Sequence, residues 1–285
     1  MALCKHISAF PAGRARLDPA LDPAARSPGA DGRGHAASSF GGGATLAPFP
    51  ITVAILAGGL GTRLRPVVSD RPKVIADIGG RPFLEWSMEA LDRYGFRDVV
   101  LCAGYQSDRL SQTLGSRQGN LRLRYSVEDQ PLGTGGALRH ALPLFNSDLV
   151  LVLNGDSFCE VNLRAFLEAH IAARARASLV IARLEETGRF GRVTLRPDWT
   201  VQDFQEKSGI PEPGWINAGI YLFRRDLLAG LPAEQPLSLE RDLLPRWLAE
   251  GIHGFPATGK FIDIGTPESL AQAEGFFAGL QRTAA

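Results

Sequence analysis

The feature of this 285-residue chain that most constrains its fold is a glycine turn placed directly after an apolar run. The run over 52–56 is rich in β-branched residues and predicts a buried strand. Gly58, Gly59 and Gly61 follow it, and glycines at such positions let the backbone approach a ligand closely. Successive amide N–H groups in a turn of this kind form a concavity that binds anions. The sequence therefore predicts a phosphate-binding turn at the end of the first strand of an α/β sheet.

Two cations accompany this turn. Arg63 supplies a planar guanidinium that matches phosphate oxygens, and Lys73 follows Pro72, which restrains the backbone before it. A P-loop needs a Gly-Lys-Ser/Thr sequence, and no Gly-Lys pair lies near the turn. The dinucleotide fingerprint needs a third glycine at the position where Leu64 stands. From spacing alone, the turn is a polyphosphate site whose class stays open.

Composition is that of an ordinary globular enzyme. Lys and Arg number 31 against 30 Asp and Glu, so we expect neither nucleic acid nor an acidic membrane surface as a partner. No apolar run approaches the ~18 residues of a membrane span. The cysteines, Cys4, Cys102 and Cys159, have no CxxC spacing, so neither a disulfide framework nor a zinc site is expected. A reducing cytoplasm is the expected compartment.

The chain divides into two parts of different composition. Residues 1–50 are rich in Ala, Gly, Pro and Arg without a sustained period, which predicts a disordered N-terminal extension. From residue 51 to 285, strand and helix patterns alternate, for example a helix over 82–94 and strands over 98–102 and 121–127. Such alternation favours right-handed crossovers in a mostly parallel sheet with helices on both faces. We therefore expect a single Rossmann-like α/β domain over 51–285.

A second glycine-rich segment, 130–136, follows the predicted strand over 121–127. It is expected to open a helix over 137–142, where its glycines allow close backbone approach. The N-terminus of a helix favours anions or carbonyl groups, so the segment is a candidate ligand contact. A flexible turn without a ligand is the alternative interpretation.

Two aspartates end predicted strands. Asp156 follows an apolar run over 149–153, and Asp263 ends a short one that begins at Phe261. A lone aspartate in this position is often only a helix cap. The alternative is a Mg²⁺ site, because Mg²⁺ takes one or two carboxylates and completes its shell with water and phosphate oxygens.

The segments 56–64 and 71–73 together resemble the signature of the sugar-1-phosphate nucleotidyltransferases. The resemblance extends from Ile51 to the final helix. It implies a GT-A-like nucleotidyltransferase fold, an NTP and a sugar 1-phosphate as partners, and Mg²⁺ as cofactor. The implied reaction moves a nucleoside monophosphate to the sugar phosphate and releases pyrophosphate.

The same resemblance implies roles for individual residues. The implied catalytic residues are Arg63, Lys73, Asp156 and Lys207. The implied nucleotide contacts are Leu56, Ala57, Gly58, Gly59, Gly61, Thr62, Gln130, Pro131, Gly133 and Thr134. The implied sugar-phosphate contacts are Gly155, Gly191, Glu206, Lys207, Asn217 and Gly219, and the implied metal ligands are Asp156 and Asp263.

Within the family, the 131–137 segment and the compact length are most similar to the D-glycero-α-D-manno-heptose 1-phosphate guanylyltransferases. GTP and that heptose 1-phosphate are then the expected substrates, in the synthesis of cell-surface polysaccharide precursors. Mannose-1-phosphate guanylyltransferases and other hexose-1-phosphate enzymes are alternatives. A non-catalytic nucleotide-sugar-binding regulator is disfavoured because the cations and aspartates are all present, and a dinucleotide-dependent oxidoreductase because the turn does not match. Homo-oligomerisation is left open.

Overall fold

The computed structural model of the chain describes residues 49–59, 61–64, 66–205, 207, 209 and 211–284. They belong to the larger of two compact units, which spans residues 37–285. The smaller unit, residues 1–36, lies outside the described residues, as does most of the predicted N-terminal extension. A domain boundary at residue 50 therefore stays a prediction.

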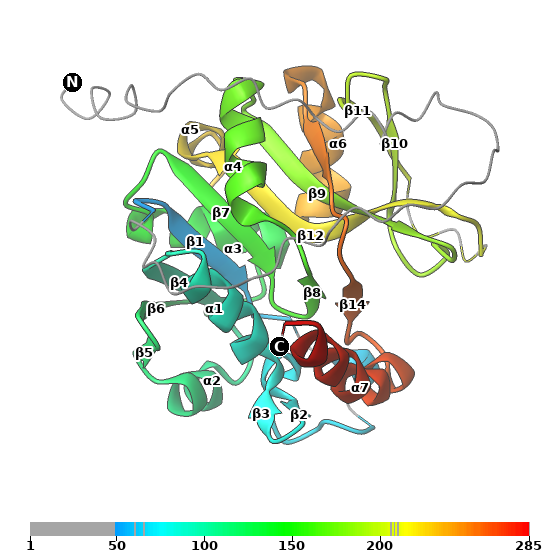
Figure 1. Ribbon diagram of the computed structural model, residues 1–285. Coiled ribbons are helices and arrows are strands. Elements are labelled where there is room, and N and C mark those ends of the chain that lie inside the picture. The colour runs from blue at the N-terminus through cyan, green and yellow to red at the C-terminus, as the bar shows by residue number, and fades with distance from the viewer. Residues whose placement is uncertain are drawn as a thin grey trace, which may run out of the picture. The chain divides into compact units, whose positions relative to one another are not determined.

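A ten-stranded sheet forms the centre of the larger unit (Figure 1). Its strands are β1 (Thr52–Leu56), β4 (Asp98–Ala103), β5 (Arg117–Gln118), β6 (Leu121–Val127), β7 (Leu149–Asn154), β9 (Ala177–Leu184), β10 (Arg192–Leu195), β11 (Val201–Gln205), β12 (Gly214–Arg224) and β13 (His253–Pro256). The strand order is β11-β10-β12-β7-β1-β4-β6-β5, and β9 pairs with β12 and β13. Two small pairs lie outside this sheet: β2 (Asp77–Ile78) with β3 (Arg81–Pro82), and β8 (Ser157–Cys159) with β14 (Phe261–Asp263).

The centre of the sheet is parallel, as predicted. Strands β7, β1, β4 and β6 run in one direction, and Leu56 at the end of β1 lies opposite Cys102 and Asn154. The long strand β12 then adds antiparallel to β7, and β9 adds antiparallel to β12. Because parallel strands end at one edge, the segments that follow β1, β6 and β7 gather there.

Helices cover both faces of the sheet, which confirms the expected architecture. They are α1 (Phe83–Arg93), α2 (Ser107–Leu114), α3 (Gly133–Ala141), α4 (Leu163–Ala172), α5 (Arg225–Ala229), α6 (Leu244–Trp247) and α7 (Pro267–Ala284), with short turns η2 (Thr62–Leu64), η3 (Lys73–Ile75), η4 (Leu142–Leu144), η5 (Leu239–Leu243) and η6 (Leu248–Glu250). No helix in the described part of the chain combines the length and the apolar character needed to span a membrane.

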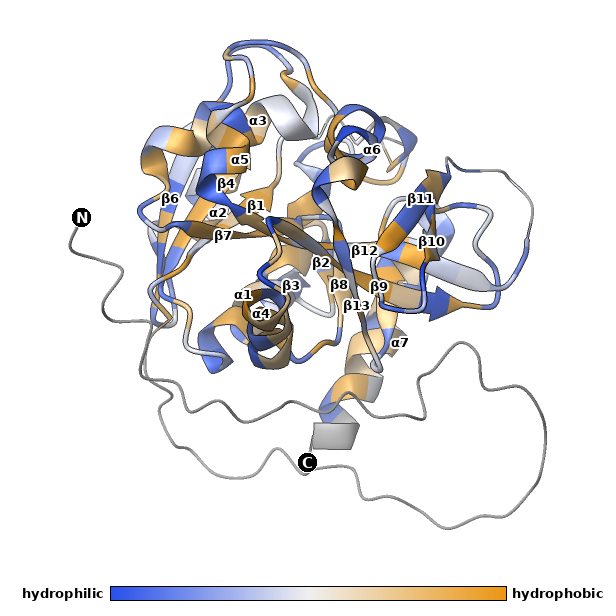
Figure 2. Ribbon diagram, turned by 90° about the horizontal axis from the view of Figure 1, so that it is seen from above, coloured by the Kyte–Doolittle hydropathy of each residue, from blue (hydrophilic) through white to orange (hydrophobic). Residues whose placement is uncertain are grey.

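Alternate residues of β1 face two different cores. Val53 and Ile55 pack with α1, α2 and α4 on one face, whereas Ala54 packs with α3, α5 and α6 on the other. This alternation is the period of two expected of a strand that is buried on both sides. Figure 2 shows apolar stretches along the central strands between the two layers of helices.

A third, smaller core fixes the position of β14. Phe277 of α7 stacks on Trp86 of α1, with ring centroids 4.2 Å apart, and meets Phe158 of β8 edge to face. Ile262 of β14 belongs to the same cluster. The C-terminal helix therefore holds β14 against β8, next to the carboxyl edge of the sheet.

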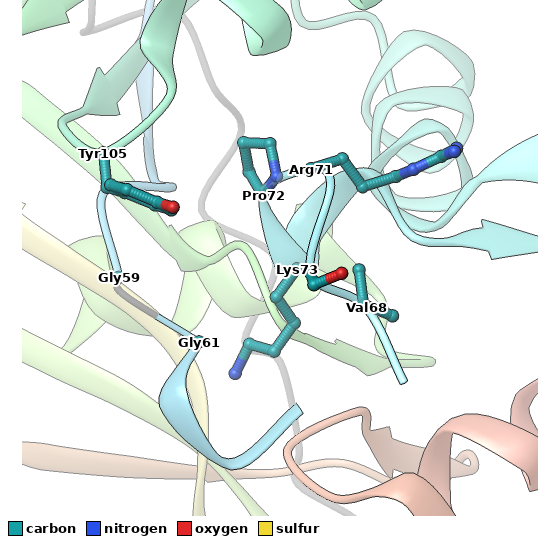
Figure 3. A pocket seen from close by; sticks show the side chains of 8 residues that line it. Gly59, Gly61, Val68, Arg71, Pro72, Lys73 and Tyr105 are labelled. Carbon is teal, nitrogen blue, oxygen red and sulfur yellow. The ribbon is translucent and has the colours of Figure 1, made fainter. Parts of the chain in front are cut away.

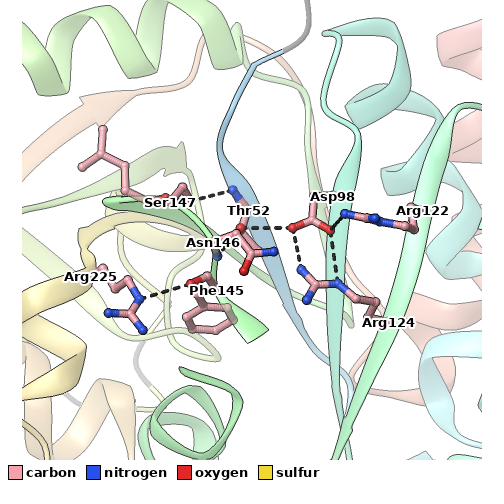
Figure 4. Close-up of polar contacts among 9 residues, drawn as sticks. Thr52, Asp98, Arg122, Arg124, Phe145, Asn146, Ser147 and Arg225 are labelled. Carbon is pink, nitrogen blue, oxygen red and sulfur yellow. Dashed lines mark hydrogen bonds and ion pairs between the residues drawn. The ribbon is translucent and has the colours of Figure 1, made fainter. Parts of the chain in front are cut away.

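A polar network closes the opposite edge (Figure 4). Asp98, the first residue of β4, accepts hydrogen bonds from the Arg124 guanidinium at 3.2 and 2.5 Å and from the Thr52 hydroxyl at 3.2 Å. The Thr52 N–H donates to the Ser147 hydroxyl at 2.8 Å. These contacts pair the polar groups at the starts of the central strands, far along each strand from the glycine turn.

Candidate active site

The turn between β1 and η2 is built for close packing. A Cβ atom on Gly58 would lie 2.7 Å from Oε1 of Glu128 and 3.2 Å from the amide nitrogen of Gly104, so a larger residue does not fit without movement. Gly61 has a φ of 57°, a region that favours glycine. Gly59, by contrast, has open space around it. The turn is thus held against the ends of β4 and β6 while Gly59 faces outward.

The predicted cations lie on two short turns beside these glycines. Arg63 is exposed on η2, and Lys73 is the first residue of η3. Figure 3 shows the Lys73 side chain extending toward Gly61, whereas Arg71 extends in the opposite direction. Arg71 forms an exposed ion pair with Asp70 instead. The pocket at this point is lined by Gly59, Gly61, Val68, Ser69, Arg71, Pro72, Lys73 and Tyr105.

Lys73 forms an ion pair with Asp156. The aspartate follows β7, and the N–H of Gly155 before it donates to the Leu56 carbonyl at the end of β1, at 2.9 Å. A Cβ on Gly155 would lie 2.7 Å from that carbonyl oxygen, so glycine is required for this approach. The Lys73 side chain is 16% exposed and that of Asp156 is 34% exposed, so the pair is open to a ligand from one side.

Asp263 reaches the same place from the far end of the chain. In the β8–β14 pair it lies opposite Ser157, and the N–H of Ile264 donates to the carbonyl of Asp156 at 2.9 Å. Burial, and then the charge of Asp156, raise the pKa of Asp263, while the N–H of Gly265 acts in the other direction. The two predicted metal ligands therefore share one edge of the sheet and one electrostatic environment.

The donor set fits a divalent cation. The two carboxylates are close enough to interact electrostatically, and each is paired with a cation: Asp156 with Lys73, and Asp263 with Arg189 at 3.0 Å. A Cβ on Gly265 would lie 2.9 and 3.0 Å from the two Asp263 carboxylate oxygens, so glycine leaves room for this carboxylate. Among the described residues, no group of three or more His, Cys, Asp or Glu is placed to hold a metal ion. Two carboxylates are the number with which Mg²⁺ is commonly held beside phosphates.

The second glycine segment differs from its prediction. Helix α3 begins at Gly133 rather than at Ala137. The N–H groups of Gly135 and Gly136 donate to the carbonyl of Leu237 at 2.8 and 3.3 Å. The carbonyl that meets these two amides at the helix N-terminus therefore comes from the chain itself. A contact this distant in sequence leaves no mark on the local pattern.

Thr134 is also engaged within the chain. Its hydroxyl donates to Oε2 of Glu240 at 2.9 Å and accepts the N–H of Leu239 at 2.7 Å. Gln130 and Pro131, before the helix, are exposed. Contact of Gln130, Pro131 and the Gly133 backbone with a nucleotide stays a prediction, and for Thr134 it is limited to the backbone.

The structure brings three of the predicted sugar contacts together. The N–H of Asn217 donates to the Gly191 carbonyl at 3.2 Å, and the Asn217 side chain accepts the N–H of Gly219 at 3.0 Å. Gly219 has a φ of 75° at a register shift in β12, and a Cβ there would lie 2.8 Å from the Ser157 hydroxyl. Because Ser157 follows Asp156, these residues lie beside the aspartate pair.

The remaining predicted contacts are less completely described. Glu206 and the side chain of Thr62 lie outside the described residues. Lys207 is exposed after β11, and in the described part of the chain no contact joins it to Lys73 or Asp156. The N–H of Gly209 donates to the carbonyl of Gly188 at 3.1 Å, so the two loops on either side of β10 and β11 touch.

Comparison with known proteins identifies the family. The Nucleotidyl transferase family pattern matches residues 52–278. The D-glycero-alpha-D-manno-heptose 1-phosphate guanylyltransferase of Aneurinibacillus thermoaerophilus is 36% identical over 221 residues, which are 77% of this chain and 95% of that protein. The chain belongs to the nucleotidyl transferase family.

Two further relatives agree with this assignment. The mannose-1-phosphate guanylyltransferase of Mycobacterium tuberculosis is 31% identical over 231 residues, which cover 80% of this chain and 64% of that protein. The crystal structure of HddC from Yersinia pseudotuberculosis complexed with GMP-PN matches with a TM-score of 0.73 and 32% identity, over 80% of this chain and 99% of that one. The family and the nucleotidyltransferase class expected from segments 56–64 and 71–73 are confirmed.

Two charged residues of this family member escaped the sequence prediction. Glu128 directly follows β6 and lies against the glycine turn, and its Oε2 accepts the N–H of Leu132 at 2.8 Å, so it bridges both glycine segments. Burial raises the pKa of Glu128. Arg189 is the partner of Asp263. Glu128 could have been found as the residue that directly follows a strand, whereas the pairing of Arg189 spans 74 residues and has no local signal.

Proposed function

We propose that this enzyme transfers a guanylyl group from GTP to a sugar 1-phosphate, producing a GDP-sugar and pyrophosphate. The first candidate for the acceptor is D-glycero-α-D-manno-heptose 1-phosphate, on which a relative 36% identical to this chain acts. One observation carries this function: Lys73, Asp156 and Asp263 meet at the carboxyl edge of the sheet beside the glycine turn. Cations and carboxylates at one place suit a reaction between two phosphates.

The reaction needs no protein nucleophile. The second pKa of a phosphate monoester is about 6, so a sugar 1-phosphate is already a dianion at neutral pH. One of its oxygens forms a bond to the α-phosphorus of GTP while the bond to the pyrophosphate oxygen breaks. Alignment of the two anions and relief of their repulsion are the main requirements, and both can come from fixed charges.

In this proposal, the glycine turn and the charged residues of the site have defined parts. The amides of Gly58, Gly59 and Gly61, with Arg63 and Lys73, hold the triphosphate, which the open space at Gly59 and the orientation of Lys73 support. The sugar phosphate contacts are Lys207, Glu206, Gly155, Gly191, Asn217 and Gly219. Asp156 and Asp263 would hold Mg²⁺, which would supply positive charge to the reacting phosphates.

Glu128 supports guanine as the base. A carboxylate that holds no metal repels phosphate, so in this proposal Glu128 faces a part of the nucleotide that donates hydrogen bonds. Guanine presents two adjacent donors, N1–H and the N2 amino group, which match the two oxygens of a carboxylate. Oε2 of Glu128 already accepts from Leu132, and a carboxylate oxygen can accept a second bond. A uracil or thymine offers one donor between two carbonyls and matches less well.

Pyrophosphate release from a matrix of nucleotides and sugar 1-phosphates tests this function. GTP, ATP, UTP, CTP and dTTP are each combined with heptose, mannose and glucose 1-phosphates in the presence of Mg²⁺. The highest kcat/KM is expected with GTP and D-glycero-α-D-manno-heptose 1-phosphate. Turnover with no combination would rule out this function. Preference for mannose 1-phosphate would select the second candidate, which the 31% identical mannose enzyme favours.

Base recognition has its own control. Glu128→Gln keeps an oxygen for the N–H of Leu132 but replaces one acceptor by a donor, so it should lower kcat/KM for GTP at least tenfold and leave that for ATP unchanged. An equal loss for all nucleotides would show that Glu128 only supports the loop.

We place the enzyme in a reducing cytoplasm, where it supplies activated sugar for surface polysaccharides. The buried free thiols of Cys102 and Cys159 support that compartment.

A further inference from the structure

Arg189 links a loop to the aspartate pair of the site. It lies in the loop between β9 and β10, and its Nη2 donates to Oδ1 of Asp263 at 3.0 Å. The same loop is anchored one residue later, where the Phe190 ring meets Phe261 of β14 edge to face at 5.5 Å. Arg189 also lies over the Phe190 ring at 5.6 Å. The loop is thus fixed to β14 by an aromatic contact that does not depend on the ion pair.

The cations of this site balance the charge that a metal would bring. Lys73 neutralises Asp156 and Arg189 neutralises Asp263, so two single positive charges stand beside two carboxylates. A divalent cation bound by both carboxylates supplies the same total charge. Its arrival therefore leaves both cations without their partners, beside two phosphates that need positive charge.

The Arg189 pair is suited to exchange. The side chain of Arg189 is 49% exposed, compared with 16% for Lys73, and ion pairs of such exposed groups contribute little to stability. A cation held this weakly is readily displaced from a carboxylate by a divalent metal. Since the Phe190–Phe261 contact keeps the loop in place, the released guanidinium stays within side-chain reach of the metal site.

A backbone hydrogen bond joins the loop that carries Lys207 to the loop that carries Arg189. Gly209 donates to the Gly188 carbonyl at 3.1 Å, so the segment with Lys207 touches the segment with Arg189. Under the proposed function, Lys207 contacts the sugar phosphate and Asp263 holds the metal. Arg189 therefore belongs to a loop that contacts both Asp263 and the segment of Lys207.

We propose that Arg189 is an exchangeable counter-ion: it holds the Asp263 carboxylate while no metal is bound, and it binds the phosphate of the sugar 1-phosphate once the metal has taken Asp263. Only the second half of this inference, the binding of the sugar phosphate by Arg189, rests on the proposed function. In this proposal, Arg189 binds the substrate and also affects the affinity of the site for the metal. An ion pair that never exchanges its partner would not have both properties.

The first half is tested without any substrate. Titration calorimetry measures Mg²⁺ binding to the full chain, and Arg189→Ala should bind Mg²⁺ roughly two- to fivefold more tightly than wild type, because the competing cation is gone. Arg192→Ala is the matched control: Arg192 lies on the adjacent strand and pairs with Glu212 rather than with Asp263. It removes the same charge and should leave the Mg²⁺ affinity within twofold of wild type. The proposal would be overturned if Arg189→Ala bound Mg²⁺ with the wild-type affinity or more weakly.

The second half is read from steady-state kinetics. At saturating Mg²⁺, Arg189→Ala should raise KM for the sugar 1-phosphate at least tenfold while KM for GTP changes less than twofold. Arg189→Lys keeps the charge and should restore most of that loss. An unchanged KM for the sugar 1-phosphate would overturn the assignment of Arg189 to that phosphate. If wild type turned over no substrate, the proposed function would fail, while the Mg²⁺ titration would still decide the exchange at Asp263.

Discussion

Lys73 and Asp156 are 83 residues apart in sequence and form an ion pair at the carboxyl edge of the sheet. The lysine arrives on a 3-10 turn after Pro72, and the aspartate arrives directly after β7. Both charges are therefore paired with each other before a ligand binds. Such pre-organisation is what a reaction between two anions requires.

Removal of either member of this pair should abolish most turnover. We expect Lys73→Ala and Asp156→Ala each to lower kcat by roughly 10²- to 10³-fold, because each removes a fixed charge at the reacting phosphates. The melting temperature should change little, since both side chains are partly exposed. The control is Lys260→Ala, which removes an exposed lysine elsewhere. A kcat near the wild-type value in either variant would contradict the assigned roles.

The network at the opposite edge should affect stability without affecting catalysis. Asp98→Ala removes the acceptor for Arg124 and Thr52, and we expect a loss of about 1–3 kcal/mol in the free energy of unfolding. Urea denaturation measures this loss, and Asp108→Ala on the exposed surface of α2 is the control. The kcat of Asp98→Ala should stay at the wild-type value. A large fall in kcat with unchanged stability would show that the two edges are coupled.

His170 should make the fold sensitive to acid. Burial, with the positive charges of His253 and Arg224, lowers the pKa of His170 from 6.5 to about 4, and its Nδ1 lies 2.8 Å from the Ser178 hydroxyl. Between these two pH values the unfolded chain binds the proton and the folded chain does not, so stability falls as pH drops below 6.5 and stops falling near 4. The loss from this group amounts to roughly 3 kcal/mol in total.

Comparison of urea denaturation at pH 7 and pH 5 measures this effect. His170→Gln cannot take up a proton, so its free energy of unfolding should change less between the two pH values than that of wild type. His140, which pairs with exposed Glu234, provides the control variant His140→Gln. Equal pH dependence in wild type and His170→Gln would contradict the assignment to His170.

The glycines of the two turns should respond differently to alanine. Gly133 has a φ of 70°, and a Cβ there would lie 2.6 Å from the Leu237 carbonyl oxygen, so Gly133→Ala should cost more than about 1 kcal/mol in stability. Gly59 has open space around it, so Gly59→Ala should leave stability nearly unchanged and raise KM for GTP. Thermal denaturation and steady-state kinetics separate the two effects. A reversed pattern would show that the turn at Gly59, rather than that at Gly133, is under structural constraint.

Much of the framework follows from local pattern. The strand expected over 121–127 is β6 with the same bounds, and the helix expected over 82–94 is α1 over Phe83–Arg93. The strand depends on the alternation of apolar residues, and the helix depends on their helical spacing and on Pro82 at its start. These signals act over a few residues. The start of α3 was misplaced because Gly133 and Gly135 are fixed by Leu237, a partner about a hundred positions away.

The chain's own residues determined the strand, the glycine turn and the two aspartates at strand ends, because periodicity and turn chemistry act between near neighbours. Only the tertiary structure decided that Asp263 would stand beside Asp156, since the β8–β14 pair and the packing of α7 bring them together. The tertiary structure also brings the charged residues Arg189 and Glu128 next to the site. Electrostatic partners are set by distance in space, and that distance is a property of the folded sheet rather than of the sequence pattern.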